Sequence, residues 1–388
     1  MTSTRTFRPI ADWKAHEDSV LGVQGWNREI ITQVSHSMYS LLSFNTSDRH
    51  GRDNKLHFWK LTPAAPLLTD AAGVPNLSTP ILTSSMDVNA LNYCRFALHP
   101  LPETGSPRAL LALPNLIESE LVDIWELPSG TRLHAAIGTI KGAPPRKPFS
   151  DEGRNIYKTG IVMSLHIFQT STDIRVLAAY ESGTVTLWIR PLSEKVRSIE
   201  GNGWESVWSV KHHLEAVMGL AVTRDNVLAA SISADHLICR YNLNQDRNTS
   251  IEHLPPHETK HPGNGAVAFR ADGRVLGVAG WDGAIRLYST GLRRGGDSTQ
   301  AQQEPTTATL IIDPNRKMRA LGTLEYFKES CFAMAFANEA SSTAADSESA
   351  EVEDGMSFAR MKARSRWLAV GGKNGRIAIW ELDSFEKR

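Results

Sequence analysis

The segment GWDGAIRLY, residues 280–288, holds the pattern that decides the fold: a turn leads into an alternating strand that ends in an aromatic residue. The same form recurs in GRDNKLHFW, IESELVDIW, YESGTVTLW, SADHLICRY and GKNGRIAIW. The terminal aromatics are Trp59, Trp125, Trp188, Tyr241, Tyr288 and Trp380, and the turn residues six positions earlier are Asp53, Ser119, Ser182, Asp235, Asp282 and Asn374. Self-similarity of this kind indicates a repeat protein.

Two further strands precede each of these segments. The nearer strand is a short apolar run such as RVLGVAG or NVLAAS, and the farther one is a run such as VMGLAV or GAVAF. Three strands and a less regular fourth are typical of a propeller blade. The repeats resemble WD repeats, so we expect an all-β chain in which residues 1–388 form one WD40-type β-propeller domain with six recognisable blades.

The start of the chain leaves the number of blades open. The segment TFRPIADWKAH reads as an outer strand that leads directly into the next blade. We expect the six copies to derive from a seven-bladed parent that has lost its opening blade. In the alternative, six copies close when FRPIADW pairs beside the blade that ends at Trp380.

Surplus residues between the copies predict insertions. Their composition is that of loops, rich in Pro, Gly, Ser and charged residues, and they cover residues 62–87, 138–158, 291–318 and 339–366. A fifth segment, residues 33–49, interrupts a strand pair. Its removal brings the spacing from His16 to Trp59 close to that from His213 to Tyr241. We hypothesise that it is a retained in-frame intron or a gene-model error.

Composition excludes several classes of protein. Lys and Arg together number 42, as do Asp and Glu, so the formal net charge is zero and no global field favours nucleic acid. We therefore predict no direct nucleic-acid contact. No apolar segment is long enough for a signal peptide or a membrane span, so we expect no membrane association. The scattered Cys94, Cys239 and Cys331 suggest buried thiols without a disulfide or a metal.

The polar residues at fixed repeat positions have a structural interpretation. In WD repeats, a His, a Ser or Thr, the turn Asp and the terminal aromatic form a hydrogen-bond network within one blade. Phosphate-binding, nucleophile-elbow and zinc-protease motifs are missing from the sequence, so we predict no enzyme, cofactor, metal ligand or small-molecule substrate. The predicted structural residues are His16, Asp53, Trp59, Trp188, His213, Ser231, Asp235, Tyr241, Asp282, Tyr288 and Trp380.

The residue before each turn position is the candidate for partner binding, because in WD repeats it commonly projects onto one face of the propeller. The candidates are Arg52, Glu181, Trp281 and Lys373, with Ala234 at the same position of another copy. Trp281 is the most informative, because Trp and Arg are enriched among interface hot spots. An aromatic side chain packed under a neighbouring loop is the competing interpretation.

Segments between the repeat positions carry a more specific resemblance. VDIWELPSG, KTGIVMSLHIF, GNGAVAFRADGRVLGVAGWDGAIRLY and LGTLEYFKESCFAMAFA are similar to the fungal WD-repeat ASTRA-associated protein 1 family, which resembles a G-protein-β-like WD protein of animals. The resemblance implies a nuclear scaffold subunit of the ASTRA complex, tied to chromatin remodelling and to co-chaperone maturation of phosphatidylinositol-3-kinase-related kinases. Its implied partners are co-chaperone and kinase-related subunits.

A generic WD adaptor remains the alternative, either a substrate receptor for ubiquitin ligation or a histone-tail reader. A receptor should carry an additional helical docking segment. A reader should present acidic or aromatic side chains at the centre of the propeller.

Overall fold

The computed structural model describes residues 13–16, 20–27, 29–34, 54–61, 79–102, 105–139, 159–193, 199–200, 203–245, 254–294, 310–313, 316–337, 351–352, 356–357 and 366–382. The chain divides into two compact units. The first consists of Met1–Thr172 and Leu192–Trp204, and the second of Asp173–Pro191 and Glu205–Arg388.

The described part of the chain contains strands, turns and connections but no helix, and its main sheets are the six blades of a β-propeller. The expected all-β, WD-type fold is therefore confirmed. Five of the blades have four strands, and the described part of the last blade has three.

The first unit contains the first two blades, ordered β1-β2-β3-β4 and β5-β6-β7-β8, and the strand β9. Each strand pairs antiparallel with the next one along the chain. The bounds are β1 (Val20–Trp26), β2 (Glu29–Val34), β3 (Lys55–Lys60), β4 (Ile81–Asp87), β5 (Ala97–Pro100), β6 (Ala109–Pro114), β7 (Val122–Leu127), β8 (Thr131–Ile137) and β9 (Val162–Gln169).

The second unit begins with the later strands of the third blade, whose order is β12-β11-β10-β9. Its bounds are β10 (Asp173–Tyr180), β11 (Thr184–Pro191) and β12 (Glu205–Lys211). The fourth blade has β13 (Val217–Val222), β14 (Leu228–Ser233), β15 (Leu237–Asn242) and β16 (His257–Glu258). The fifth has β17 (Asn264–Phe269), β18 (Val275–Gly280), β19 (Ala284–Ser289) and β22 (Arg319–Glu325), and the sixth has β23 (Cys331–Phe336), β26 (Trp367–Gly372) and β27 (Ile377–Glu381).

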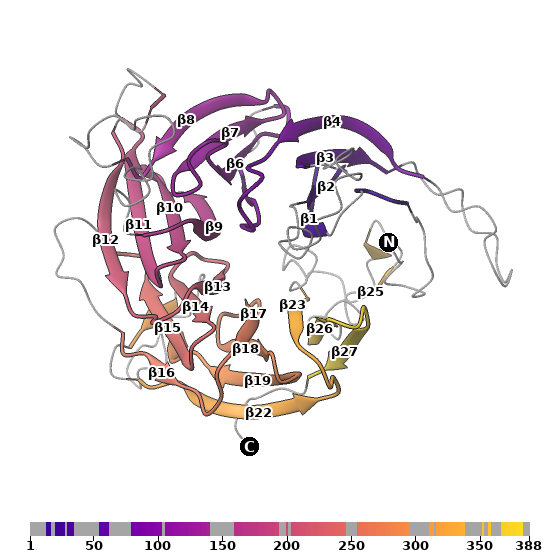
Figure 1. Cartoon of the computed structure of the whole chain (residues 1–388), viewed down its shortest axis with the longest axis vertical. Helices are drawn as coiled ribbons and strands as arrows, with labels where there is room; N and C mark the ends of the chain where they lie inside the picture. The colour runs from indigo at the N-terminus through magenta and orange to yellow at the C-terminus, as the bar shows by residue number, and fades with distance from the viewer. Residues whose placement is uncertain are drawn as a thin grey trace, which may run out of the picture. The chain divides into compact units, whose positions relative to one another are not determined.

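The second strand of a blade is mainly apolar because it is covered on both sides. All positions of β6, β10, β14 and β18 are buried. A strand with one solvated face would alternate instead, which is why most of each of these strands reads as an apolar run. Within the second unit, the first strands β13, β17 and β23 lie side by side, as Figure 1 shows.

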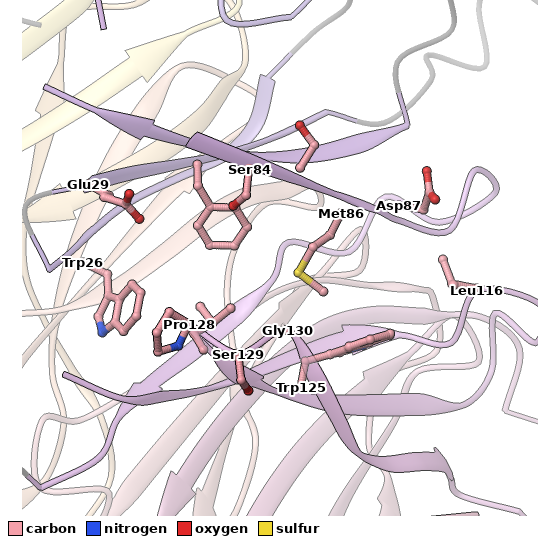
Figure 2. Close-up of a pocket in the computed structure, with 13 residues that line it drawn as sticks. Trp26, Glu29, Ser84, Met86, Asp87, Leu116, Trp125, Pro128, Ser129 and Gly130 are labelled. Carbon is pink, nitrogen blue, oxygen red and sulfur yellow. The ribbon is translucent and has the colours of Figure 1, made fainter. Parts of the chain in front are cut away.

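The hydrophobic cores lie between successive blades. In the first unit, Ile31, Leu56 and Phe58 of the first blade pack against Leu111 and Leu127 of the second. Outside this core, the same two blades line an open groove (Figure 2). In the second unit, a core joins the fourth and fifth blades, and another joins the fifth and sixth. Burial between blades thus supplies the packing that a single blade cannot make.

Several strands fall inside the segments expected to be insertions. Residues 62–87 include β4, which pairs with β3 as the outer strand of the first blade, so the strand boundary was missed there. The sequence of β4, ILTSSMD, does not predict a strand, because most of the side chains of β4 are exposed and its apolar residues do not alternate with polar ones. Residues 291–318 and 339–366 each contain a short hairpin: β20 (Leu292–Arg294) with β21 (Leu310–Ile312), and β24 (Glu351–Val352) with β25 (Met356–Ser357).

The suspected insert at residues 33–49 begins inside β2. Gln33 is buried in this strand, where its amide donates to the Cys94 carbonyl at 2.9 Å and accepts from the Phe96 amide at 2.7 Å. The residues after Val34 lie outside the described part of the chain.

Candidate protein-binding face

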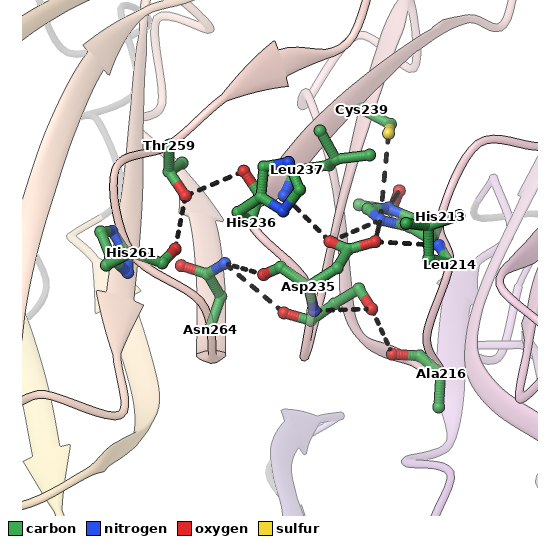
Figure 3. Close-up of polar contacts among 12 residues, drawn as sticks. His213, Leu214, Ala216, Asp235, His236, Leu237, Cys239, Thr259, His261 and Asn264 are labelled. Carbon is green, nitrogen blue, oxygen red and sulfur yellow. Dashed lines mark hydrogen bonds and ion pairs between the residues drawn. The ribbon is translucent and has the colours of Figure 1, made fainter.

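The fourth blade brings His213, Ser231, Asp235 and Tyr241 into one hydrogen-bonded chain (Figure 3). His213 Nδ1 lies 3.1 Å from Asp235 Oδ2, and His213 Nε2 lies 2.7 Å from the Ser231 hydroxyl. The Ser231 hydroxyl lies 2.9 Å from the Tyr241 hydroxyl. Asp235 also accepts from the backbone amides of Leu214 and Leu237, so its buried carboxylate is well supplied with donors.

The hydrogen bonds of this chain have one consistent order of donors and acceptors. Nδ1 of His213 donates to the Asp235 carboxylate, so Nε2 accepts from Ser231, and Ser231 in turn accepts from Tyr241. Burial lowers the pKa of His213, against the opposing effect of Asp235, so the neutral imidazole is favoured. Burial also raises the pKa of Tyr241, which keeps its hydroxyl a donor.

Asp, His and Ser in this order resemble a catalytic triad, but their burial gives them a structural role. The side chains of His213 and Ser231 are fully buried, so a substrate cannot reach the serine hydroxyl. Asn264 of β17 donates to the carbonyls of Ser233 and Asp235, which ties the same turn to the next blade. The network therefore holds the turn between β14 and β15 in place.

The first blade has a related chain, in which Thr32 replaces Ser231. Trp59 Nε1 donates to the Thr32 hydroxyl at 2.9 Å, and His16 Nε2 lies 2.7 Å from the same oxygen. His16 also stacks on His57. The predicted Asp53 lies outside the described residues. Thr32 was missed, although its place in the strand before the turn matches that of Ser231.

The fifth blade departs from the predicted network. Asp282 forms a two-pronged ion pair with Arg286, at 2.6 and 3.1 Å, and this hydrogen bonding lowers the pKa of Asp282. The cross-strand pair Val278 and Arg286 occupies the register of Ser231 and Cys239 in the fourth blade. Valine offers no hydroxyl to link a histidine to Tyr288, so the turn carboxylate pairs with the arginine instead.

The remaining predicted aromatics have other contacts. Trp188 Nε1 lies 3.4 Å from the Tyr180 hydroxyl, and the Trp380 ring packs against Tyr326 and Phe327. In the second blade, the polar centre is Asp123, which the sequence did not reveal. Its fully buried carboxylate accepts from Asn115, Arg132 and the Ala136 amide. The position of Asp123 inside the apolar sequence VDIW was the feature from which a buried, hydrogen-bonded carboxylate could have been predicted.

Two predicted partner-binding residues lie next to each other. Ser330 donates from its hydroxyl to the Trp281 carbonyl at 3.0 Å, and its carbonyl accepts from the Lys373 amide at 2.8 Å. The β18–β19 turn and the β26–β27 turn are therefore fixed on one side of the fifth and sixth blades. Both side chains are exposed, and Trp281 retains 39% of its accessible surface.

The exposed Trp281 ring packs closely against two glycines, Gly263 and Gly265. A Cβ atom on Gly263 would lie 2.5 Å from this ring, and one on Gly265 would lie 3.3 Å from it and 3.2 Å from Phe332. Phe332 is itself 43% exposed. We define the Trp281 face as Trp281, Ser330, Phe332 and Lys373, which combines two exposed aromatic rings with one cation on short turns.

The other predicted face residues are placed separately. Glu181 is exposed in the turn between β10 and β11, and Ala234 lies in the turn between β14 and β15. Arg52 lies outside the described residues. Ser330 and Phe332 were missed because they belong to the connection and the first strand of the next blade, so the repeat position that selects Trp281 does not select them.

The described residues contain no group of three His, Cys, Asp or Glu side chains placed to bind a metal. Cys94, Cys239 and Cys331 are free and buried, and burial raises the pKa of each thiol. Within these segments, no helix has the length and hydropathy of a membrane span.

Comparison with known proteins confirms the resemblance seen in the sequence. ASTRA-associated protein 1 of Verticillium alfalfae is 29% identical over 97% of this chain and 82% of its own length. The protein of the same name from Aspergillus flavus is 27% identical over 97% of this chain and 87% of its own length. The mouse guanine nucleotide-binding protein subunit beta-like protein 1 is 26% identical over 86% of this chain and 73% of its own length. No protein-family model matches the chain.

Proposed function

We propose that this chain, which resembles ASTRA-associated protein 1 over nearly its whole length, is a non-enzymatic scaffold subunit of the ASTRA complex in the nucleus. In this role it takes part in chromatin remodelling and in the co-chaperone maturation of phosphatidylinositol-3-kinase-related kinases. The near-complete coverage carries the proposal, because the similarity includes the segments between blades as well as the repeat positions.

The Trp281 face supports a scaffold mechanism. Exposed Trp is enriched among the few residues that dominate binding energy at interfaces. Here the ring is fixed over Gly263 and beside Ser330, so little conformational freedom is lost when a partner binds. The polar chain around His213 is buried and structural, which leaves the exposed turns to contact other subunits.

A generic WD adaptor is the second candidate, in the form of a reader of a histone tail. The pair of exposed aromatic rings, Trp281 and Phe332, favours it, because aromatic side chains can bind a cationic ammonium group. The two candidates differ in the proteins that should accompany the chain.

Affinity purification of the tagged full chain from nuclear extract, followed by mass spectrometry, tests the proposal. We expect co-chaperone and kinase-related subunits to be recovered in amounts comparable to the chain itself. Recovery of histones or of ubiquitin-ligase subunits in their place would overturn the ASTRA assignment and favour the adaptor.

A further inference from the structure

A second surface for a partner lies in the first unit, along the groove between the first two blades. Its volume is about 430 Å³, within the range of roughly 300 to 1,000 Å³ that is typical of ligand sites. Figure 2 shows Met86 near its middle, Trp125 and Pro128 opposite, Glu29 and Trp26 at one end, and Asp87 and Leu116 at the other.

The groove has a mixed lining, and its apolar side chains come from both blades. Phe58 and Met86 of the first blade face Trp125 and Leu127 of the second, and Phe58 and Leu127 belong to the packed core beneath. The groove is thus an outward extension of a rigid core. Aliphatic side chains of a partner would be removed from water by packing against Phe58, Met86, Trp125 and Leu127, and this burial would favour binding.

The outer strand β4 makes the groove suitable for an extended chain. Ser84, Ser85, Met86 and Asp87 all line it. Side chains of successive residues point to opposite faces of a strand, so four consecutive lining residues place the groove along the edge of β4 as well as on its face. β4 is the last strand of its sheet, so the described structure pairs no further strand with that edge. A free edge can accept an added strand.

The two carboxylates at the ends of the groove are not equivalent. Asp87 is neutralised by Lys55, whose Nζ lies 2.5 Å from Asp87 Oδ1. Glu29 accepts from the Thr83 hydroxyl at 3.0 Å, and among the described residues it has no ion-pair partner. The end of the groove at Glu29 therefore favours a cation.

We propose that this groove binds an extended segment of a protein partner, which pairs with the edge of β4, places aliphatic side chains against Met86 and Trp125, and presents a Lys or Arg to Glu29. The site shares no residue with the Trp281 face, so it gives the chain a second, independent contact. A scaffold requires at least two such contacts, but the proposal does not depend on the ASTRA assignment.

Fluorescence polarisation with the purified full chain and synthetic nine-residue peptides tests this proposal. Three peptide pools are used, each with alternating positions: Arg with Val, Ile or Leu; Glu with the same aliphatic residues; and Arg with Ser. We expect measurable binding at low salt for the first pool only. Proline at the central position of a binding peptide should abolish its binding, because proline cannot donate to a β-ladder.

Matched variants locate the binding. Glu29→Gln should weaken it about threefold to fivefold, as expected for loss of an exposed ion pair, whereas Asp87→Asn should have a smaller effect because Lys55 already neutralises Asp87. Ser84→Arg adds a cation at an exposed position of the groove and should weaken binding further. Glu215→Gln, an exposed substitution in the second unit, is the control and should change nothing.

Equal binding of the acidic and basic pools, absence of binding by every pool, or an undiminished affinity of folded Glu29→Gln and Ser84→Arg would each overturn the proposal. Circular dichroism and the thermal midpoint of each variant show that it is folded. Because the Trp281 face is intact in these variants, loss of peptide binding with retained nuclear partners separates this site from the proposed function.

Discussion

His213 shows how a single side chain fixes the geometry of a blade. It joins the connection before β13 to the turn carboxylate of Asp235 and to the hydroxyl of Ser231. Each donor in this chain has an acceptor, so loss of one member leaves buried polar groups without partners. The cost of such loss is larger than the net contribution of one ordinary hydrogen bond.

Ser231→Ala should therefore lower the free energy of unfolding by about 1 to 3 kcal/mol, because His213 Nε2 and the Tyr241 hydroxyl both lose their partner. Urea unfolding followed by circular dichroism measures the change. Ser206→Ala, an exposed serine of β12, is the control and should remain within about 0.5 kcal/mol of the parent. Equal effects of the two substitutions would contradict the role of the network.

Stability should fall as the pH falls below about 6.5. Burial lowers the folded-state pKa of His213 below its ordinary value of 6.5, so the unfolded chain binds a proton that the folded chain does not. The stabilising effect is complete above pH 6.5 and is lost as the pH approaches the lowered folded-state pKa. His99, His257 and His261 have lowered pKa values and act in the same direction.

Unfolding free energies measured from about pH 7 to about pH 5 in His213→Gln and in the parent isolate the contribution of His213. The variant should be less stable but should have a shallower dependence on pH. An unchanged slope would show that His213 does not contribute.

At the scale of the element, a turn presents the side chain that a partner would contact. Gly263 precedes β17 with a φ of +81°, and its missing side chain makes room for the Trp281 ring. The position of this ring therefore depends on two turns. One turn carries Trp281, and the other contains Gly263, against which the ring packs.

Gly263→Ala should displace the Trp281 ring and destabilise the fold by about 1 kcal/mol or more, since alanine disfavours this positive φ. Partner recovery should fall although Trp281 is retained. Gly322→Ala is the matched control, because a Cβ there would have no heavy atom within 4 Å. Chemical denaturation and quantitative purification measure the two effects. A Gly263→Ala chain that binds like the control would contradict the proposed support of the ring.

The elements also show what the sequence could predict. The third strand of each blade was recognisable by its turn and terminal aromatic, and the second by its continuous apolar run. β4 was missed, because an outer strand exposed along most of its length has no alternation. His213, Ser231, Asp235 and Tyr241 could be grouped by repeat position. Asp123 could not, because its partners Asn115 and Arg132 are specific to one blade.

At the scale of the whole molecule, the segment at residues 33–49 stays a hypothesis. If a retained intron or a gene-model error accounts for it, the spliced transcript should lack these codons and should join the codon of Thr32 directly to that of His50. Sequencing of the messenger RNA decides this. A message that contains the segment would contradict the idea, and Gln33, buried and hydrogen-bonded in β2, would then be native.

Each of the two units thus combines packed β-blades with exposed side chains on short turns. Polar chains differ from blade to blade, with a histidine network in the fourth blade, a carboxylate centre in the second and an ion pair in the fifth. This variation is compatible with a structural role, since each arrangement satisfies its own buried or partly buried groups.

The most direct test of the central claim is a quantitative comparison of the proteins recovered from nuclear extract with the parent chain, Trp281→Ala and Glu215→Gln. A non-enzymatic scaffold that binds through the Trp281 face predicts that Trp281→Ala is folded and loses at least one subunit of the complex by about tenfold or more, as for an interface hot spot, whereas Glu215→Gln loses none. Equal recovery of every subunit by all three chains would contradict the claim.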